Sequence, residues 1–190
     1  AKIASFAAKT LKIPIIYINQ IGGNDDLVFD GNSFILNKYG KPIKKLGSCK
    51  EDFSCWDIEE KNQTLNNKKD KCEMETIFDA LVLGLKDYSK KCKFQTALLG
   101  LSGGIDSALV SVIAAAALGG ENIFSITMPS KWSSKHSQID AYELAKRLKI
   151  NINKMSIENI FNCFEDTFLR QLNFELKGIT NENIQSRIRG

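Results

Sequence analysis

Residues 99 to 107, Leu-Gly-Leu-Ser-Gly-Gly-Ile-Asp-Ser, join a short apolar run to an alanine-rich segment. The run at 96–101 is typical of a buried parallel strand. From Ser107 to Leu118 apolar residues return at steps of three and four, and two glycines follow, so the spacing predicts a helix. The sequence therefore predicts a strand, a tight turn over 102–106 and a helix.

This turn has the properties of a phosphate-binding loop. The first amides of a helix lack partners within it, and the helix dipole is positive there, so an anion is stabilised. Gly103 and Gly104 permit positive φ and remove Cβ atoms that would obstruct phosphate oxygens. Ser102 and Ser107 supply hydroxyl donors. The Asp106 carboxylate repels a polyphosphate unless a cation lies between them, so we expect Asp106 to bind Mg²⁺.

A second strand is predicted over 122–128, ended by Pro129-Ser130. A right-handed crossover makes the two strands parallel and brings their carboxyl ends to one edge, where ligands of doubly wound sheets bind. Met128 lies at this edge, and we expect its backbone N–H and C=O to contact adenine. A doubly wound parallel sheet of the α/β class is therefore expected.

Two further helices, over 137–149 and 159–172, flank a third strand at 150–155. The second helix carries an apolar stripe, which we expect to be core. Its members are Phe161, Phe164, Phe168 and Leu172.

The hexapeptide Ser-Gly-Gly-Ile-Asp-Ser resembles the pyrophosphate loop of the N-type ATP pyrophosphatases, which have an adenine nucleotide alpha hydrolase-like fold. It lacks the Gly-Lys-Ser/Thr of a Walker loop and the Gly-x-Gly-x-x-Gly of dinucleotide folds. The stretches 128–141 and 180–189 follow in the order and spacing of NAD synthetases. In that family ATP adenylylates the carboxylate of nicotinic acid adenine dinucleotide, and ammonia then displaces AMP to give NAD⁺.

The resemblance to NAD synthetases implies ATP and Mg²⁺ as cofactors and a set of binding residues. Mg²⁺ is expected on Asp106, and Asn183 and Arg187 are expected to contact the deamido-dinucleotide. The residues expected to bind ATP are Gly100, Leu101, Ser102, Gly103, Gly104, Ile105, Asp106, Ser107 and Met128.

The first 60 residues indicate a different domain. A strand is predicted over 13–19, then a glycine turn at Gly22-Gly23, then two strands over 26–37 joined near Gly31. The segment 18–34 resembles the closing part of a nitrilase-type glutaminase domain, the ammonia source of glutamine-dependent NAD synthetases. The resemblance implies the C-terminal edge of a nitrilase-like α/β sandwich, with glutamine or ammonia as a further substrate.

The polar segment 61–72 is expected to link residues 1–60 to a synthetase domain at 73–190. A helix over 75–91 is expected to pack beside the nucleotide-binding sheet. The Cys, Glu and Lys of such glutaminases have no match here, and the Thr, Glu and Lys of the synthetases follow the 180–189 segment. We therefore expect an excerpt of a longer enzyme, with no glutaminase catalytic residue and no activity by itself.

Composition excludes several other classes. The net charge of +4 is mild and no basic stripe is present, so nucleic-acid binding is not expected. No apolar run has membrane-spanning length. The five cysteines form no Cys-x-x-Cys pair, which favours reduced thiols in the cytoplasm over zinc or disulfides. His136 is expected at the surface, and a shared substrate site favours a homo-oligomer.

Two alternatives remain open at the level of the sequence. The first is another enzyme with the same loop, such as a GMP or asparagine synthetase or a tRNA-modifying ligase. The second is a nucleotide-binding scaffold without chemistry.

Overall fold

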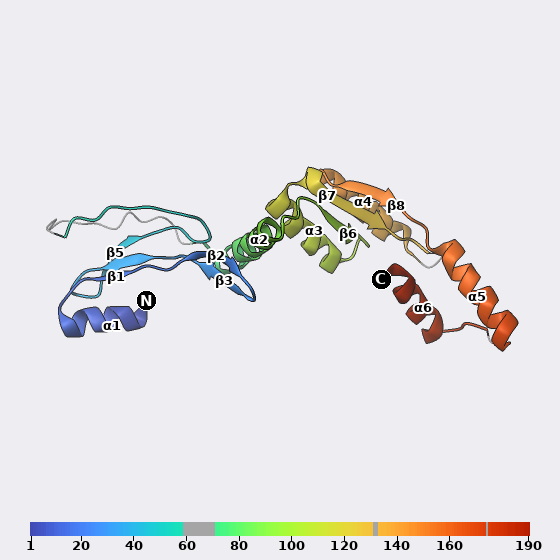
Figure 1. Cartoon of the computed structure of the whole chain (residues 1–190), viewed down its shortest axis with the longest axis horizontal. Coiled ribbons are helices and arrows are strands. Elements are labelled where there is room, and N and C mark those ends of the chain that lie inside the picture. The colour runs from blue at the N-terminus through green and yellow to red at the C-terminus, as the bar shows by residue number, and fades with distance from the viewer. Residues whose placement is uncertain (59–70, 131–132, 174) are drawn as a thin grey trace. The chain divides into compact units, whose positions relative to one another are not determined.

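The computed structural model describes residues 1–58, 71–130, 133–173 and 175–190. Its contacts divide the chain into two units, Ala1–Lys93 and Phe94–Gly190 (Figure 1). No helix among the described residues is both long enough and apolar enough to cross a lipid bilayer.

In the described residues of the first unit, two helices accompany two antiparallel sheets. The three-stranded sheet has the order β1-β4-β5, and the hairpin β2-β3 forms the other sheet. Ile35, Leu36 and Ile43 are buried, whereas Tyr17 on β1 stacks on Phe34 of β4. The elements of this unit are α1 (Lys2–Leu11), β1 (Ile15–Tyr17), β2 (Ile21–Asn24), β3 (Leu27–Asp30), β4 (Phe34–Leu36), β5 (Pro42–Lys45) and α2 (Glu73–Cys92).

The glycine turn predicted at Gly22-Gly23 is wrong. Both glycines lie in β2, where they pair with Phe29 and Val28 of β3. The chain turns instead at Asp25, which has φ 51°. Aspartate tolerates the left-handed region better than most residues, so the turn needs no glycine. The strands predicted over 26–37 exist as β3 and β4, but they do not pair with each other.

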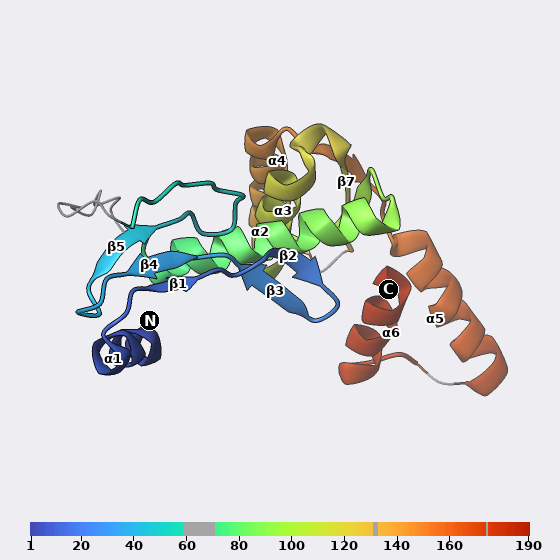
Figure 2. The ribbon, with the colours of Figure 1, turned by 60° about the vertical axis from the view of Figure 1, so that its left-hand side comes forward.

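Helix α2 packs against the hairpin β2-β3 (Figure 2). The Gly23 N–H donates to Asp87 Oδ2 at 2.9 Å, and Lys91 Nζ donates to the Gly23 carbonyl. A Cβ on Gly23 would lie 3.3 Å from the Gly84 Cα, so the two backbones approach closely. The contacts therefore group α2 with the first unit, although the sequence indicated a helix beside the nucleotide-binding sheet. The expected linker falls mainly at residues outside those described.

The second unit is α/β with a parallel sheet, as the sequence predicted. The strand order is β6-β7-β8, with Gly100 opposite Ile126 and Ile126 opposite Asn153. Helices α3 and α4 contact each other and the sheet. The elements are β6 (Ala97–Gly100), α3 (Ile105–Leu118), the 3₁₀ turn η1 (Gly120–Asn122), β7 (Ile123–Thr127), α4 (Lys135–Leu148), β8 (Asn151–Lys154), α5 (Glu158–Leu172) and α6 (Ile179–Arg189).

Helices α5 and α6 share a small core of Phe161, Leu176 and Ile184, against which Phe168 packs. The predicted apolar stripe is therefore only partly core. Phe164 and Leu172 are 44% and 67% exposed, so the cluster leaves this part of the stripe largely uncovered.

Candidate nucleotide-binding site

The loop predicted to bind phosphate connects β6 to α3. Gly100 ends β6, and the buried Leu101 continues the sheet by donating its N–H to Ile126 O at 2.9 Å. The chain then turns through 102–104, and Ile105 begins α3 with Gly104 as its N-cap. The strand, turn and helix predicted from the sequence are confirmed.

Two serine hydroxyls brace the loop. Ser107 Oγ lies 3.0 Å from Ser102 Oγ, accepts from the Ser102 N–H at 3.2 Å and donates to Gly104 O at 3.0 Å. Ser102 Oγ in turn accepts from the Gly104 N–H at 3.2 Å. The hydroxyls that the sequence predicted to contact phosphate therefore hold the shape of the turn in this structure.

Gly103 is the tightest point of the loop. Its φ is 84°, and a Cβ placed there would lie 2.0 Å from the backbone oxygen of Ser137, in the first turn of α4. The loop thus lies directly against α4. Only glycine satisfies both the positive φ and this close approach.

The first turn of α3 leaves amides available to an anion. In the part of the chain that the structure describes, the N–H groups of Ile105, Asp106 and Ser107 donate to no acceptor, because the helical ladder starts with Ala108 N–H to Gly104 O. Three amides and the positive helix end therefore meet at one point.

Asp106 is exposed and forms no ion pair among the described residues. No group of three or more His, Cys, Asp or Glu gathers there or elsewhere in the described ranges. Mg²⁺ is commonly held by one or two carboxylates together with substrate phosphates and water. A single carboxylate beside the loop is compatible with that donor set.

Met128 follows β7 at the same sheet edge as the loop, and a Cβ on Gly100 would lie 3.6 Å from Met128 Cε. Four consecutive carbonyls at this edge, from 126 to 129, each accept a hydrogen bond, and the donors come from three segments of the chain. The bonds are Leu101 N–H to Ile126 O (2.9 Å), Met155 N–H to Thr127 O (2.9 Å), Arg189 Nε–H to Met128 O (3.3 Å) and Ile157 N–H to Pro129 O (3.4 Å).

The sequence did not identify Gln185 and Arg189 as residues of this edge. Arg189 Nη2 donates to Ser130 Oγ at 3.3 Å, and the Ser130 hydroxyl donates to Gln185 Oε1 at 3.0 Å. Gln185 is buried, and a polar residue on the inner side of an amphipathic helix was the one signal available for it.

Asn183 and Arg187 lie one helical turn apart on an exposed side of α6. Gln185 and Arg189, also one turn apart, contact the segment after β7 from another side of the same helix. The structure therefore does not bring Asn183 and Arg187 into contact with the loop of their own chain among the described residues. His136 is exposed, as expected.

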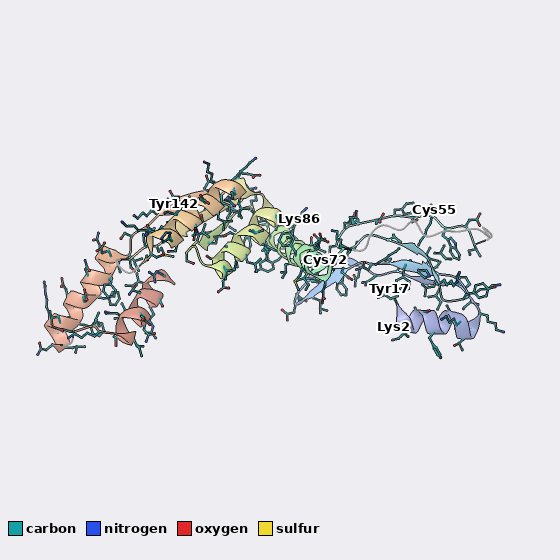
Figure 3. The ribbon with its side chains drawn as sticks, turned by 180° about the vertical axis from the view of Figure 1, so that it is seen from behind. Lys2, Tyr17, Cys55, Cys72, Lys86 and Tyr142 are labelled. Atoms are coloured by element: carbon teal, nitrogen blue, oxygen red, sulfur yellow. The ribbon has the colours of Figure 1, made fainter. Side chains whose placement is uncertain are left out.

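The five cysteines are all free thiols, as expected. Cys72, labelled in Figure 3, is the N-cap of α2 and has a structural role there. Its Sγ accepts from the Glu75 N–H at 3.4 Å, and its own N–H donates to Glu75 Oε2 at 3.0 Å. This pair is a capping box with a thiol in place of the usual hydroxyl.

The family model of NAD synthase matches residues 77–190, which include the loop, the β7 edge and α6. The chain belongs to the NAD synthase family. The loop, with its positive helix end and free amides, is therefore the candidate nucleotide site of an NAD synthase domain.

Two relatives extend the similarity over nearly the whole chain. The glutamine-dependent NAD(+) synthetase of Synechocystis is 43% identical over 99% of this chain and 34% of its own length. That of Rhodobacter capsulatus is 39% identical over 94% of this chain and 33% of its own. The chain spans about a third of the length of these curated relatives.

A solved structure shows the same fold. The glutamine-dependent NAD+ synthetase from Acinetobacter baumannii, in complex with adenosine diphosphate, has a TM-score of 0.81 and 34% identity, covering 97% of this chain and 36% of that one.

Proposed function

We propose that this chain is part of a glutamine-dependent NAD⁺ synthetase, which converts nicotinic acid adenine dinucleotide to NAD⁺ at the expense of ATP. The observation that carries the proposal is the loop 102–107, with its unpartnered helix amides, inside an NAD synthase domain. The Acinetobacter baumannii relative binds an adenine nucleotide, which supports ATP as the ligand here.

In this proposal the loop holds the phosphates of ATP. The amides of Ile105, Asp106 and Ser107 lie at the positive end of α3, and Gly103 allows the loop to turn tightly against α4. Residues 100–107 line the phosphates, and the backbone of Met128 contacts adenine. Oriented donors offset the repulsion between the substrate carboxylate and the triphosphate, so that the carboxyl oxygen reaches the α-phosphorus.

Asp106 would hold Mg²⁺ together with the phosphates. Bound there, Mg²⁺ would supply positive charge to offset the negative charge of the phosphate oxygens, with Asp106 as its protein ligand. The exposed position of the Asp106 carboxylate, in the first turn of α3, supports this role.

Asn183 and Arg187 would contact the deamido-dinucleotide from α6. Arginine suits a pyrophosphate-bearing ligand because its guanidinium binds two oxygens at once. Both residues are exposed, on a side of α6 other than the one that contacts the β7 edge. This placement supports a site completed by a second copy of the chain, and hence a homo-oligomer.

Glutamine is the proposed nitrogen source. Relatives that are glutamine-dependent match almost the full chain, including the unit Ala1–Lys93. That unit would be the edge of a nitrilase-type glutaminase domain, and ammonia from glutamine would displace AMP from the acyl-adenylate. The cytoplasmic location expected from the free thiols is part of the same proposal.

The test is pyrophosphate release by the intact protein with ATP, Mg²⁺ and nicotinic acid adenine dinucleotide. Asp106→Ala is expected to lower kcat about 100-fold, because the charge that builds on the leaving pyrophosphate is no longer neutralised, and to raise the Mg²⁺ concentration needed for half-maximal rate.

Asp166→Ala removes an exposed carboxylate on α5 and serves as the matched control. Absence of pyrophosphate release from the wild-type protein contradicts the proposed function. Unchanged Mg²⁺ dependence in Asp106→Ala contradicts only the metal role.

A further inference from the structure

A chain of side-chain hydrogen bonds fastens residues 128–130 to α6. Arg189 donates twice, from Nε to Met128 O and from Nη2 to Ser130 Oγ, each at 3.3 Å. The Ser130 hydroxyl then donates to Gln185 Oε1 at 3.0 Å. Gln185, the last residue in this series of hydrogen bonds, is only 7% exposed, so the series ends at a buried side chain.

The other bonds along this edge have a different origin. The carbonyls of Ile126, Thr127 and Pro129 accept from backbone amides of neighbouring segments. The carbonyl of Met128 accepts from a side chain instead, that of Arg189, 61 positions away. Loss of Arg189 is therefore expected to leave the Met128 carbonyl without this donor, while the backbone pairing of β7 with β6 and β8 stays intact.

We propose that Arg189 and Gln185 are positioning residues for the base of ATP, acting through the backbone of Met128 and the side chain of Ser130. The inference rests on the proposed function, in which Met128 contacts adenine. A carbonyl oxygen accepts two hydrogen bonds, so the bond from Arg189 leaves one lone pair for the 6-amino group of adenine. By fixing the direction of this carbonyl, Arg189 sets the preference for adenine over bases that lack that donor.

The same helix links this edge to the second substrate. Asn183 and Arg187 lie on another side of α6 from Gln185 and Arg189. A dinucleotide held by Asn183 and Arg187 restrains α6, and the restraint reaches Met128 through Arg189. Each ligand is then expected to tighten the binding of the other, by the same factor in both directions.

The experiment uses the intact protein with ATP and GTP as alternative substrates, because guanine carries an oxygen where adenine carries the amino group. Arg189→Ala is expected to lower kcat/KM for ATP about tenfold, mainly through KM, and to lower it less for GTP. The ratio of ATP to GTP activity therefore falls. Arg189→Lys is expected to lie between, because an ammonium group lacks the planar fork that reaches two acceptors.

A second readout does not depend on activity. Amide hydrogen exchange in residues 126–130 is expected to speed up in Arg189→Ala and in Ser130→Ala, with no change in α3. Arg147→Ala is the matched control, because Arg147 is an exposed arginine of α4 that pairs with Glu143 one turn away. It is expected to leave both readouts at wild-type values.

An ATP-to-GTP ratio in Arg189→Ala equal to that of the control overturns the inference, and so does unchanged exchange at 126–130. If Arg189→Ala does not fold, Arg189→Lys and Ser130→Ala supply the same two readouts. A wild-type protein without pyrophosphate release contradicts the proposed function alone, since the exchange measurement still reports whether α6 fastens Met128.

Discussion

Gly103 meets two independent requirements at one position. Its φ of 84° lies in the left-handed region, and a Cβ would lie 2.0 Å from the Ser137 carbonyl oxygen. The close approach involves backbone atoms of α4, which cannot move away as readily as a flexible side chain. Gly178 has positive φ too, at 55°, but a Cβ at that position would meet no atom within 4 Å.

This contrast gives a prediction. Gly103→Ala is expected to raise the KM for ATP by more than about tenfold, because the loop must move away from α4. Gly178→Ala has backbone strain alone, so the KM for ATP is expected to stay within about twofold of wild type. Steady-state kinetics of both variants, with melting temperatures, provide the check. Equal KM values would contradict the part assigned to Ser137.

At the scale of single residues, the sequence predicted those site residues that lie close together along the chain. The loop 102–107 was predictable because its glycines, hydroxyls and acid lie within six positions. The bond from Arg189 to Met128 was not, because it joins residues 61 positions apart and depends on where α6 packs. The exposure of Phe164 and Leu172 had the same cause, since periodicity does not say how much of an apolar stripe is covered.

Among the elements, α2 begins with an unusual cap. The thiol of Cys72 accepts from the Glu75 amide, and sulfur is a weak acceptor compared with a hydroxyl. Cys72→Ala is therefore expected to lower the free energy of unfolding by about 0.5–1 kcal/mol, whereas Cys72→Ser maintains or raises it by a few tenths. Denaturant unfolding measures both.

Cys92, at the other end of α2, is exposed and serves as the matched position. Cys92→Ala is expected to leave the free energy of unfolding unchanged. If Cys72→Ser were as destabilising as Cys72→Ala, the capping interpretation would be wrong.

Helices α2 to α5 and the parallel strands β6 to β8 were predicted to within a few residues, because each carries its own apolar pattern. The hairpin β2-β3 was not, since its glycines indicated a turn and its actual turn residue is Asp25. Glycine in a strand weakens the local signal, and here the close approach to Gly84 of α2 explains why glycine is used. That reason is a tertiary contact, and the residues near Gly23 in the sequence do not indicate it.

For the molecule as a whole, two criteria assign α2 to different parts of the chain. The family model begins at residue 77 and includes most of α2, whereas the contacts of the chain group α2 with Ala1–Lys93. The domain limits at 60 and 73 expected from the sequence remain a prediction. The hydrogen bond from the Gly23 amide to Asp87 offers a direct test of whether α2 is stabilised together with the first unit or with the second.

Asp87→Ala is expected to speed hydrogen exchange in both β2-β3 and α2, because the Gly23 N–H loses its acceptor at a half-buried position. Exchange in β6, β7 and β8 is expected to stay at wild-type rates. Lys86→Ala, at the exposed neighbour labelled in Figure 3, is the control and leaves all of these segments unchanged. Faster exchange in the parallel sheet, with the hairpin unaffected, would place α2 with the second unit instead.

The contact of Gly103 with Ser137 also limits how this protein is able to diverge. An outward shift of α4 would remove the clash but keep the unfavourable torsion, and a remade turn would relieve the torsion but keep the clash. No single mutational step therefore opens this position to another amino acid. Related proteins that share this packing are expected to keep glycine at position 103 even where the surrounding residues differ.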